Sequence, residues 1–205
     1  MRTNTMRTSI LVCWLCCVSV IVGCGGGGGG GPTDTAASLT EDGWELYEVG
    51  NYEGAVVKFF RATQLDANYA DAYNGLGWSY GKMDSLQQAA DGFVLCIGKG
   101  MTTADPYAGR APVYRDLDPP QFSNAINSAT TALTKDSDYE FEHNEDFDWR
   151  DLCLIKAQCH FALKEYSQAK GLVDALGGHY IDPGSPTFIK DLADEIERLG
   201  DLYGG

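Results

Sequence analysis

The chain has 205 residues, of which 44% are apolar, so it is long enough for one globular domain or for several small repeated units. Its 15 lysine and arginine residues are scattered singly, and the 29 aspartate and glutamate residues give a net charge of −14. Nucleic-acid binding depends on clustered positive charge, so this composition argues against a nucleic-acid partner.

The N-terminus has the three-part pattern of a secretory signal peptide. Arg2 and Arg7 precede an uncharged apolar segment at residues 10–22, and small residues follow it. As a helix these 13 residues would be roughly 20 Å long, which is short of the ~30 Å hydrocarbon core of a bilayer. A stable membrane span is therefore not expected. A short uncleaved anchor and an ordinary signal peptide are the alternatives.

The end of the apolar segment, Ile21-Val22-Gly23-Cys24, resembles the lipobox of bacterial lipoproteins. The resemblance implies that a signal peptide at residues 1–23 is removed and that Cys24 receives a diacylglyceryl thioether and an acylated amino terminus. Several acyl chains together anchor a protein stably where a single chain does not. The protein would then bind the membrane through the lipid on Cys24. Because the next residue is Gly25 rather than aspartate, the resemblance favours the outer membrane, facing the periplasm.

The lipidated cysteine and a glycine-rich linker occupy residues 24–35, with seven consecutive glycines at Gly25–Gly31. Such a linker is a flexible coil, which would let the folded body stand away from the lipid headgroups. A match to the dinucleotide-binding fingerprint begins at Gly23, but no strand precedes it and no helical pattern follows, so we reject it.

The rest of the chain contains an internal repeat. A shift of 34 residues aligns similar residues with one another: Gly43 with Gly77, Trp44 with Trp78, Ala55 with Ala89, and Phe59 with Phe93. A period near this length indicates stacked helix-turn-helix units. The residues resemble the tetratricopeptide repeat, in which small residues lie where two helices cross and large ones fill the gaps. The resemblance implies an all-α, short tetratricopeptide-like helical-hairpin solenoid.

We predict about four repeats and a C-terminal capping helix. Repeats 1 and 2 cover residues 36–103, degenerate repeats 3 and 4 cover 104–180, and the capping helix and tail cover 181–205. Gly109 and Pro112 interrupt the first helix of the third repeat, so a kink or a shortened helix is expected there. In the capping helix, Leu192 and Leu199 belong to an apolar face, and Glu195 belongs to the polar face.

The resemblance implies that the first helix of each repeat lines a groove that binds protein. Carried over position by position, the groove residues are Trp44, Tyr47, Asn74, Trp78, Lys82, Arg115, Gln158 and Phe161. Trp44 and Trp78 would be equivalent aromatic platforms for a peptide, and packing in the interhelical core is the alternative. Only Asn74 and Lys82 approach the positions with which some family members hold a terminal carboxylate, so chaperone-tail binding is not expected.

The connection from Asp136 to Asp148 is rich in carboxylates. It lacks the glycine and the terminal glutamate of a calcium-binding loop, so a solvated acidic loop is favoured over a cation site. Its aromatic residues, Tyr139, Phe141 and Phe147, alternate with the charges and are expected to hold the loop against the body.

Chemically reactive residues are few and dispersed. After export, three cysteines remain, Cys96, Cys153 and Cys159, and we favour buried thiols over a disulfide or a metal site. The three histidines, His143, His160 and His179, belong to no recognisable motif. We therefore expect no catalytic residues, no cofactor and no metal.

These patterns predict a membrane-anchored, non-enzymatic interaction scaffold of the bacterial cell envelope. Its partner would be an envelope protein or peptide segment whose identity the sequence does not reveal. The alternative is a small-molecule or glycan-binding envelope lipoprotein, in which the third repeat and the acidic connection form a pocket.

Overall fold

The computed structural model describes residues 34–203. The chain divides into two units, Met1–Thr33 and Asp34–Gly205, and the second is the body discussed below. The predicted signal peptide, the lipid on Cys24 and most of the linker lie outside the described residues.

Helices form almost all of the regular structure between residues 34 and 203, where Glu140 and Asp148 make a single isolated bridge. None of the helices in this range is both long enough and apolar enough to cross a membrane. The helices are α1 (Ala36–Glu48), α2 (Tyr52–Leu65), α3 (Ala70–Lys82), α4 (Leu86–Gly98), α5 (Asp105–Asp116), α6 (Phe122–Lys135), α7 (Trp149–Ala162), α8 (Tyr166–Ala175) and α9 (Phe188–Tyr203).

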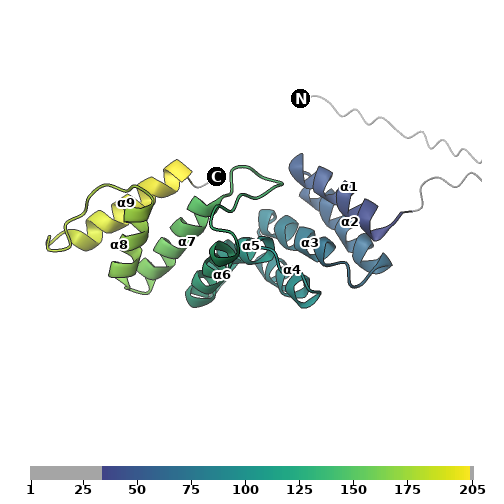
Figure 1. Cartoon of the computed structure of the whole chain (residues 1–205), viewed down its shortest axis with the longest axis horizontal. Coiled ribbons are helices and arrows are strands. Elements are labelled where there is room, and N and C mark those ends of the chain that lie inside the picture. The colour runs from purple at the N-terminus through teal and green to yellow at the C-terminus, as the bar shows by residue number, and fades with distance from the viewer. Residues whose placement is uncertain (1–33, 204–205) are drawn as a thin grey trace, which may run out of the picture. The chain divides into compact units, whose positions relative to one another are not determined.

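The helices pair into four successive hairpins, and α9 packs on the last of them (Figure 1). Each helix contacts the next one in the chain, from α1 through α8 to α9. In addition, the first helices of successive hairpins contact one another, α1 with α3, α3 with α5 and α5 with α7. These four helices form what we call the inner face. The predicted all-α helical-hairpin solenoid is confirmed.

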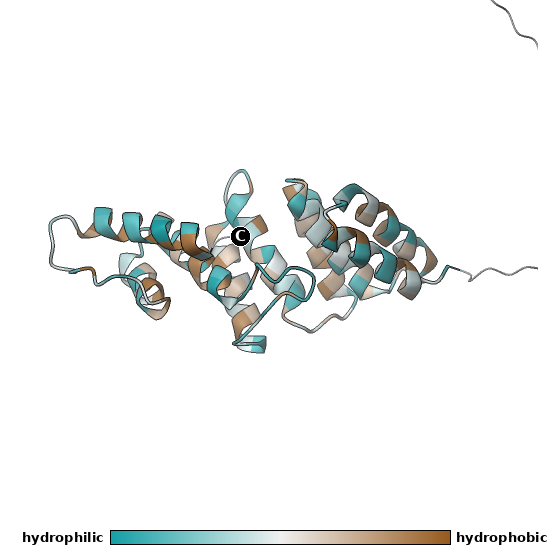
Figure 2. Cartoon of the chain, turned by 90° about the horizontal axis from the view of Figure 1, so that it is seen from above, coloured by the Kyte–Doolittle hydropathy of each residue, from teal (hydrophilic) through white to brown (hydrophobic). Residues whose placement is uncertain are grey.

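Most helices have an apolar side that is buried and a polar side that is exposed, as in α9, where hydrophobic and hydrophilic colours alternate along the ribbon in Figure 2. The two middle helices of the inner face, α3 and α5, are buried almost all round, and each has one exposed residue, Lys82 or Asp116. The helix starts are stabilised locally: Thr35 and Ser38 form a capping box at α1, and the Asn51 side chain accepts from the Gly54 N–H at α2.

Two phenylalanine rings fit between pairs of glycines. A Cβ atom added to Gly43 or Gly75 would lie 2.6 Å or 2.3 Å from the Phe59 ring. Phe93 has the same relation to Gly77 and Gly109, at 2.6 Å and 2.3 Å. In each case one glycine belongs to the same helical hairpin as the phenylalanine, and the other belongs to the first helix of the next hairpin. The absence of a Cβ therefore lets the first helices approach the buried rings.

The first helix of the third repeat contains both residues that were expected to interrupt it. α5 has 12 residues, one fewer than α1 and α3, and runs through Gly109 and Pro112. Gly109 provides the space that Phe93 occupies. Pro106 lies in the first turn, where its missing N–H costs no helical hydrogen bond.

The capping helix also differs at one position. Leu192, Ile196 and Leu199 are buried as predicted, but Glu195 is buried with them. Its carboxylate accepts hydrogen bonds from the Arg198 side chain at 2.7 and 2.9 Å and from the His179 backbone N–H at 2.6 Å. Arg198 holds the pKa of Glu195 at about 2. The placement of Glu195 on the polar face was wrong, because these donors satisfy a buried carboxylate.

We predict that Gly109→Ala destabilises the protein and that Gly171→Ala does not. The added methyl at position 109 would collide with Phe93 and Trp78 and lower the free energy of unfolding by about 1–3 kcal/mol. Gly171 lies in α8 with nothing within 4 Å of an added Cβ, so alanine should raise the free energy of unfolding by about 0.5–1 kcal/mol. Urea unfolding followed by circular dichroism measures both. Equal effects at the two positions would contradict the packing role of Gly109.

Candidate functional site

The connection between α6 and α7 folds back over the inner face. Residues 139–148, which we call the acidic hairpin, close on themselves through hydrogen bonds from the Phe141 N–H to the Phe147 carbonyl (3.0 Å) and from the Trp149 N–H to the Tyr139 carbonyl (2.8 Å). In Figure 1 the connection reaches from the start of α7 toward α1. The hairpin therefore covers the inner face of the first two repeats.

Aromatic stacking holds the hairpin there. The ring of Phe141 lies against the Trp78 indole with centroids 3.9 Å apart, and the His143 imidazole lies against the Trp44 indole, also at 3.9 Å. Tyr47 meets Phe141 edge-on at 5.9 Å. Phe141 and Tyr139 are buried, which confirms that the aromatic residues hold this connection to the body.

Polar contacts surround these stacked rings. The Trp44 Nε1–H donates to an Asp71 carboxylate oxygen at 3.2 Å, and the Tyr139 hydroxyl donates to Asp105 at 2.9 Å. His143 Nδ1 and Glu48 Oε1 lie 2.8 Å apart. Burial raises the pKa of the Asp71 and Asp105 carboxyls, and the negative charge of Glu142 on the hairpin raises both further. The covered face is thus aromatic and acidic.

The two predicted aromatic platforms belong to the core and to this covered face at once. Trp44 and Trp78 are each 6% exposed, and each also packs edge-on against the phenylalanine of its own repeat, Phe59 or Phe93. Tyr47, 2% exposed, lies beside Trp44 beneath the hairpin. Neither tryptophan is therefore an open platform in this structure.

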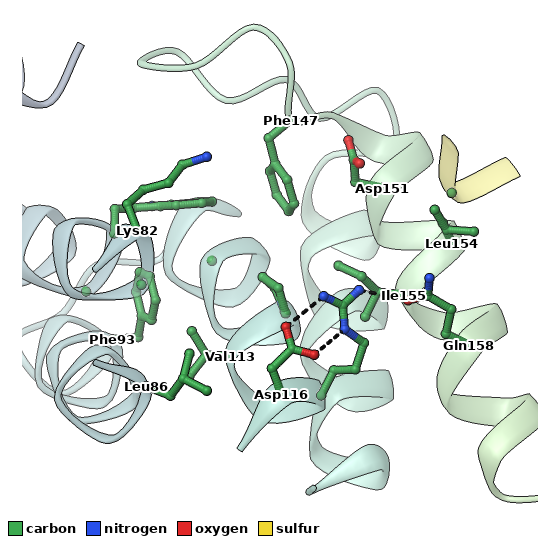
Figure 3. Close-up of a pocket in the computed structure, with 17 residues that line it drawn as sticks. Lys82, Leu86, Phe93, Val113, Asp116, Phe147, Asp151, Leu154, Ile155 and Gln158 are labelled. Atoms are coloured by element: carbon green, nitrogen blue, oxygen red, sulfur yellow. Dashed lines mark hydrogen bonds and ion pairs between the residues drawn. The ribbon is translucent and has the colours of Figure 1, made fainter. Parts of the chain in front are cut away.

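An open pocket lies farther along the inner face. This inner pocket has a cavity volume of about 390 Å³ and lies between α3, α5 and α7, with Gly200 of α9 and Phe147 of the hairpin at its border (Figure 3). Four predicted groove residues line it, namely Trp78, Lys82, Arg115 and Gln158. Its apolar wall includes Phe93, Val113, Leu154 and Ile155.

Arg115 fixes one side of the pocket. Its guanidinium makes two 2.7 Å hydrogen bonds to the carboxylate of Asp116 and donates to the Gln158 side-chain oxygen at 2.7 Å, which joins α5 to α7. The Asp116 carboxylate raises the pKa of Arg115, so the guanidinium is charged. Lys82 is exposed across the pocket and makes no ion pair within residues 34–203 (Figure 3).

Asp151 is a buried carboxyl in the pocket wall that the repeat pattern did not indicate. It is 6% exposed, and its Oδ2 accepts a 2.8 Å hydrogen bond from the Asp148 N–H as part of the capping box of α7. Burial raises the pKa of Asp151 to about 6. The sequence feature that could have indicated this position is the Asp148-x-x-Asp151 spacing, which is typical of a helix start.

Besides Trp44 and Tyr47, two more predicted groove residues do not line the pocket. Asn74, 1% exposed, lies within α3 next to the covered face. Phe161 packs edge-on against Tyr166 with centroids 5.3 Å apart, and both belong to the separate core formed with α9. The capping helix, which the repeat pattern does not include, covers the position that Phe161 would have in an open groove.

The reactive side chains lie in separate local environments. Cys96, Cys153 and Cys159 are free thiols, and burial raises the pKa of Cys96 to about 12 and of Cys159 to about 11. The three histidines lie beside different carboxylates: His143 by Glu48, His160 by Glu165 and His179 by Glu195. Within the described part of the chain, no three His, Cys, Asp or Glu side chains group closely enough to hold a metal ion.

A family model described as "TPR repeat" matches residues 43–84. The body of the chain is a tetratricopeptide-like solenoid. Three solved structures share the fold. MamA is 16% identical, with 81% of each chain covered and a TM-score of 0.56. YrrB, "a TPR protein with an unusual peptide-binding site", is 20% identical, covering 82% of this chain and 86% of that one, also at 0.56. A thermophilic TPR protein in Thermus thermophilus is 15% identical, with 82% of this chain and 83% of that chain covered and a TM-score of 0.54. The comparison with curated proteins finds no match.

Asp151 makes stability depend on pH. Its pKa is about 6 in the folded chain against an ordinary value of 3.8, so protonation favours the fold, and this contribution is lost as the pH rises from about 4 to 7. We predict that Asp151→Asn, which keeps an acceptor for Asp148, raises the free energy of unfolding at pH 7.5 by on the order of 2 kcal/mol and has little effect at pH 4. Urea titrations at both pH values test this. The exposed control Glu197→Gln should change neither value, and a gain for Asp151→Asn at pH 4 as large as at pH 7.5 would contradict the assignment.

Proposed function

We propose that the protein is a non-enzymatic scaffold that holds a segment of another polypeptide in the inner pocket, and that a lipid on Cys24 anchors it in the bacterial cell envelope. The observation that carries the proposal is the pocket itself. It lies on the face formed by the first helices, and it combines an apolar wall with charged groups at its edge.

The chemistry of the pocket suits a side chain and its flanking backbone. Phe93, Leu154 and Ile155 would bury an apolar side chain, and the exposed ammonium of Lys82 would pair with an acidic group beside it. Arg115 is already satisfied by Asp116 and Gln158, so its role is to shape the wall. Recognition without turnover needs no reacting group, and we assign no catalytic residue.

The comparisons support a peptide partner at the level of the fold. The structure of YrrB is described as having an unusual peptide-binding site, and its fold covers most of this chain. We extend to this chain only the class of ligand, a polypeptide segment, because the two sequences are 20% identical.

The envelope location rests on the N-terminal sequence. Arg2 and Arg7, the apolar segment 10–22, the lipobox-like ending at Cys24 and the glycine run form a consistent series. We propose that the lipid confines the search for a partner to the membrane surface, on the outer membrane facing the periplasm.

A small-molecule or glycan ligand is the second candidate. The cavity volume of about 390 Å³ lies within the range of pockets that hold such ligands, which is roughly 300–1,000 Å³. This candidate predicts that a soluble small ligand raises the melting temperature of the wild type and fails to do so once the pocket is filled.

We predict that Gly81→Leu abolishes binding at the inner pocket without unfolding the protein. Gly81 lines the pocket, and an added Cβ would meet only Val113, at 3.9 Å, so a leucine side chain would fill the cavity. Peptides selected from a displayed library on the wild type should bind Gly81→Leu at least ten times more weakly. Fluorescence anisotropy with the selected peptides measures the loss.

Gly171→Leu is the matched control, since Gly171 is exposed on α8 with open space around it. Selected peptides should bind this variant as they bind the wild type. If Gly81→Leu binds them unchanged while its circular dichroism matches the wild type, the pocket is not the binding site.

The anchor is tested by Cys24→Ser in a bacterial host fed labelled palmitate. We predict that the wild type incorporates the label and fractionates with membranes, whereas Cys24→Ser loses both properties, because serine cannot form the thioether. A matched Cys96→Ser variant, which alters a buried thiol of α4, should retain the label. Label persisting in Cys24→Ser would refute the lipoprotein assignment.

A further inference from the structure

We propose that the face beneath the acidic hairpin is a second binding site, for a partner turn carrying an aromatic residue and, two positions later, a lysine or arginine. The hairpin occupies this site in the structure and competes with the partner. The site adjoins the inner pocket, with which it shares Trp78 and Phe147, but the proposal does not depend on the pocket binding a peptide.

The spacing of the hairpin contacts defines the motif. Phe141 stacks on Trp78 of α3, and His143, two residues later, stacks on Trp44 of α1. Residues 141–144 form a turn, closed by a hydrogen bond from the Asn144 N–H to the Phe141 carbonyl at 3.1 Å. The turn places the Phe141 and His143 rings 5.6 Å apart. The two indoles, which occupy equivalent positions in successive repeats, thus accept side chains at positions i and i+2 of one turn.

The position of His143 suits a cation. Its imidazole lies flat on the electron-rich Trp44 ring, 2.8 Å from a Glu48 oxygen, and the same indole donates to Asp71. An arginine or lysine there would gain a cation–π contact together with the charge of the carboxylates. Arginine adds a planar guanidinium that can stack as the imidazole does.

One residue of the hairpin is a poor electrostatic match. Glu142 raises the pKa values of Asp71 and Asp105, two partly buried carboxyls, whereas His143 of the same hairpin lowers both. Like charges brought together in this way weaken the contact. A segment with a neutral residue between the aromatic residue and the cation would avoid this repulsion.

The covered face also contains polar atoms that the hairpin leaves unsatisfied. The Tyr47 hydroxyl, the Asn74 Oδ1 and the Trp78 Nε1 are buried and have no hydrogen-bond partner among the described residues. The three side chains are 2%, 1% and 6% exposed. Tyr47 and Trp78 both contact Phe141 of the hairpin through their rings, so a replacement would meet these two side chains. Donors and acceptors on a partner backbone could bond them.

The hairpin is closed by its own backbone. The Phe141–Phe147 hydrogen bond lies within it, and the bond from Trp149 to Tyr139 joins it to the start of α7. Glu142, Glu145 and Asp146 at its tip are exposed. Its displacement would break the two ring stacks and the edge-on contacts beside them, together with the polar contacts of Tyr139 with Asp105 and of His143 with Glu48. A partner must therefore replace these contacts.

The test uses the full chain in mild detergent and three labelled peptides of residues 138–149. One has the native sequence. The other two carry Glu142→Ala together with His143→Arg or His143→Gln. Fluorescence anisotropy should show at least tenfold tighter binding of the arginine peptide than of the glutamine peptide, with the native peptide weaker than the arginine peptide. Equal binding of the arginine and glutamine peptides, or no binding of either, would overturn the proposal.

Two protein variants make the test specific. Phe141→Ala with His143→Ala removes the stacking anchors of the competitor, so the arginine peptide should bind at least tenfold more tightly than to the wild type. Glu145→Gln, at the exposed tip, is the control and should bind as the wild type does. If loosening the hairpin fails to tighten binding while circular dichroism remains native, the hairpin is not a competitor and the proposal is wrong.

Glu48→Gln tests the cation position without disturbing the core. The side chain is half exposed, and its replacement should reduce the preference for arginine over glutamine, whereas the exposed control Glu53→Gln should not. An unchanged preference in Glu48→Gln would contradict the role of this carboxylate. Gly81→Leu should leave binding of the arginine peptide intact, so failure of the inner pocket and failure of this second site are distinguishable.

Discussion

The phenylalanine rings between paired glycines determine the geometry on which the rest of the body depends. Phe59 and Phe93 each lie where two glycines of neighbouring first helices provide no Cβ. This packing brings α1, α3 and α5 close together. It also supports the functional residues, because Trp44 packs on Phe59 and Trp78 on Phe93. One interaction, repeated after 34 residues, therefore places two indoles on one face.

The inner face changes character where this packing ends. The residue 34 positions after Phe93 is Asn127, which is exposed and cannot fill the same gap. Between α5 and α7 a polar contact, Arg115 with Gln158, joins the helices instead. The space next to this contact is the inner pocket. The first two repeats thus present an aromatic surface under a hairpin, and an open cavity follows between the second repeat and the degenerate repeats.

The sequence predicted features that repeat and missed those that depend on contacts between distant segments. Comparison at a shift of 34 residues identified the glycines and phenylalanines of the first two repeats, but Gly109 was interpreted as a helix breaker although it aligns with Gly75. The groove positions Trp78, Lys82, Arg115 and Gln158 line the inner pocket. Phe161 lies on α7 as well but packs in the core formed with α9, and no repeat pattern describes the capping helix.

The hairpin was predictable only in part. Tyr139, Phe141 and Phe147 alternate with acidic residues, which predicts that the aromatic side chains hold this segment to the body, and they do so. The surface that receives it lies far earlier in the chain, since Glu48 and His143 are 95 residues apart. Periodicity within a segment contains no information on such a pairing, so the covering of Trp44 and Trp78 required the structure.

Hydrogen exchange of the full chain, with and without the arginine peptide, tests the central claim most directly. Mass spectrometry of fragments follows residues 139–148, α1 and α3 separately. A partner that displaces the hairpin should increase exchange of the Phe141 amide region and decrease exchange at the inner face of α1 and α3. If the peptide binds and protection of residues 139–148 is unchanged or increased, the hairpin does not compete for this face and the account is contradicted.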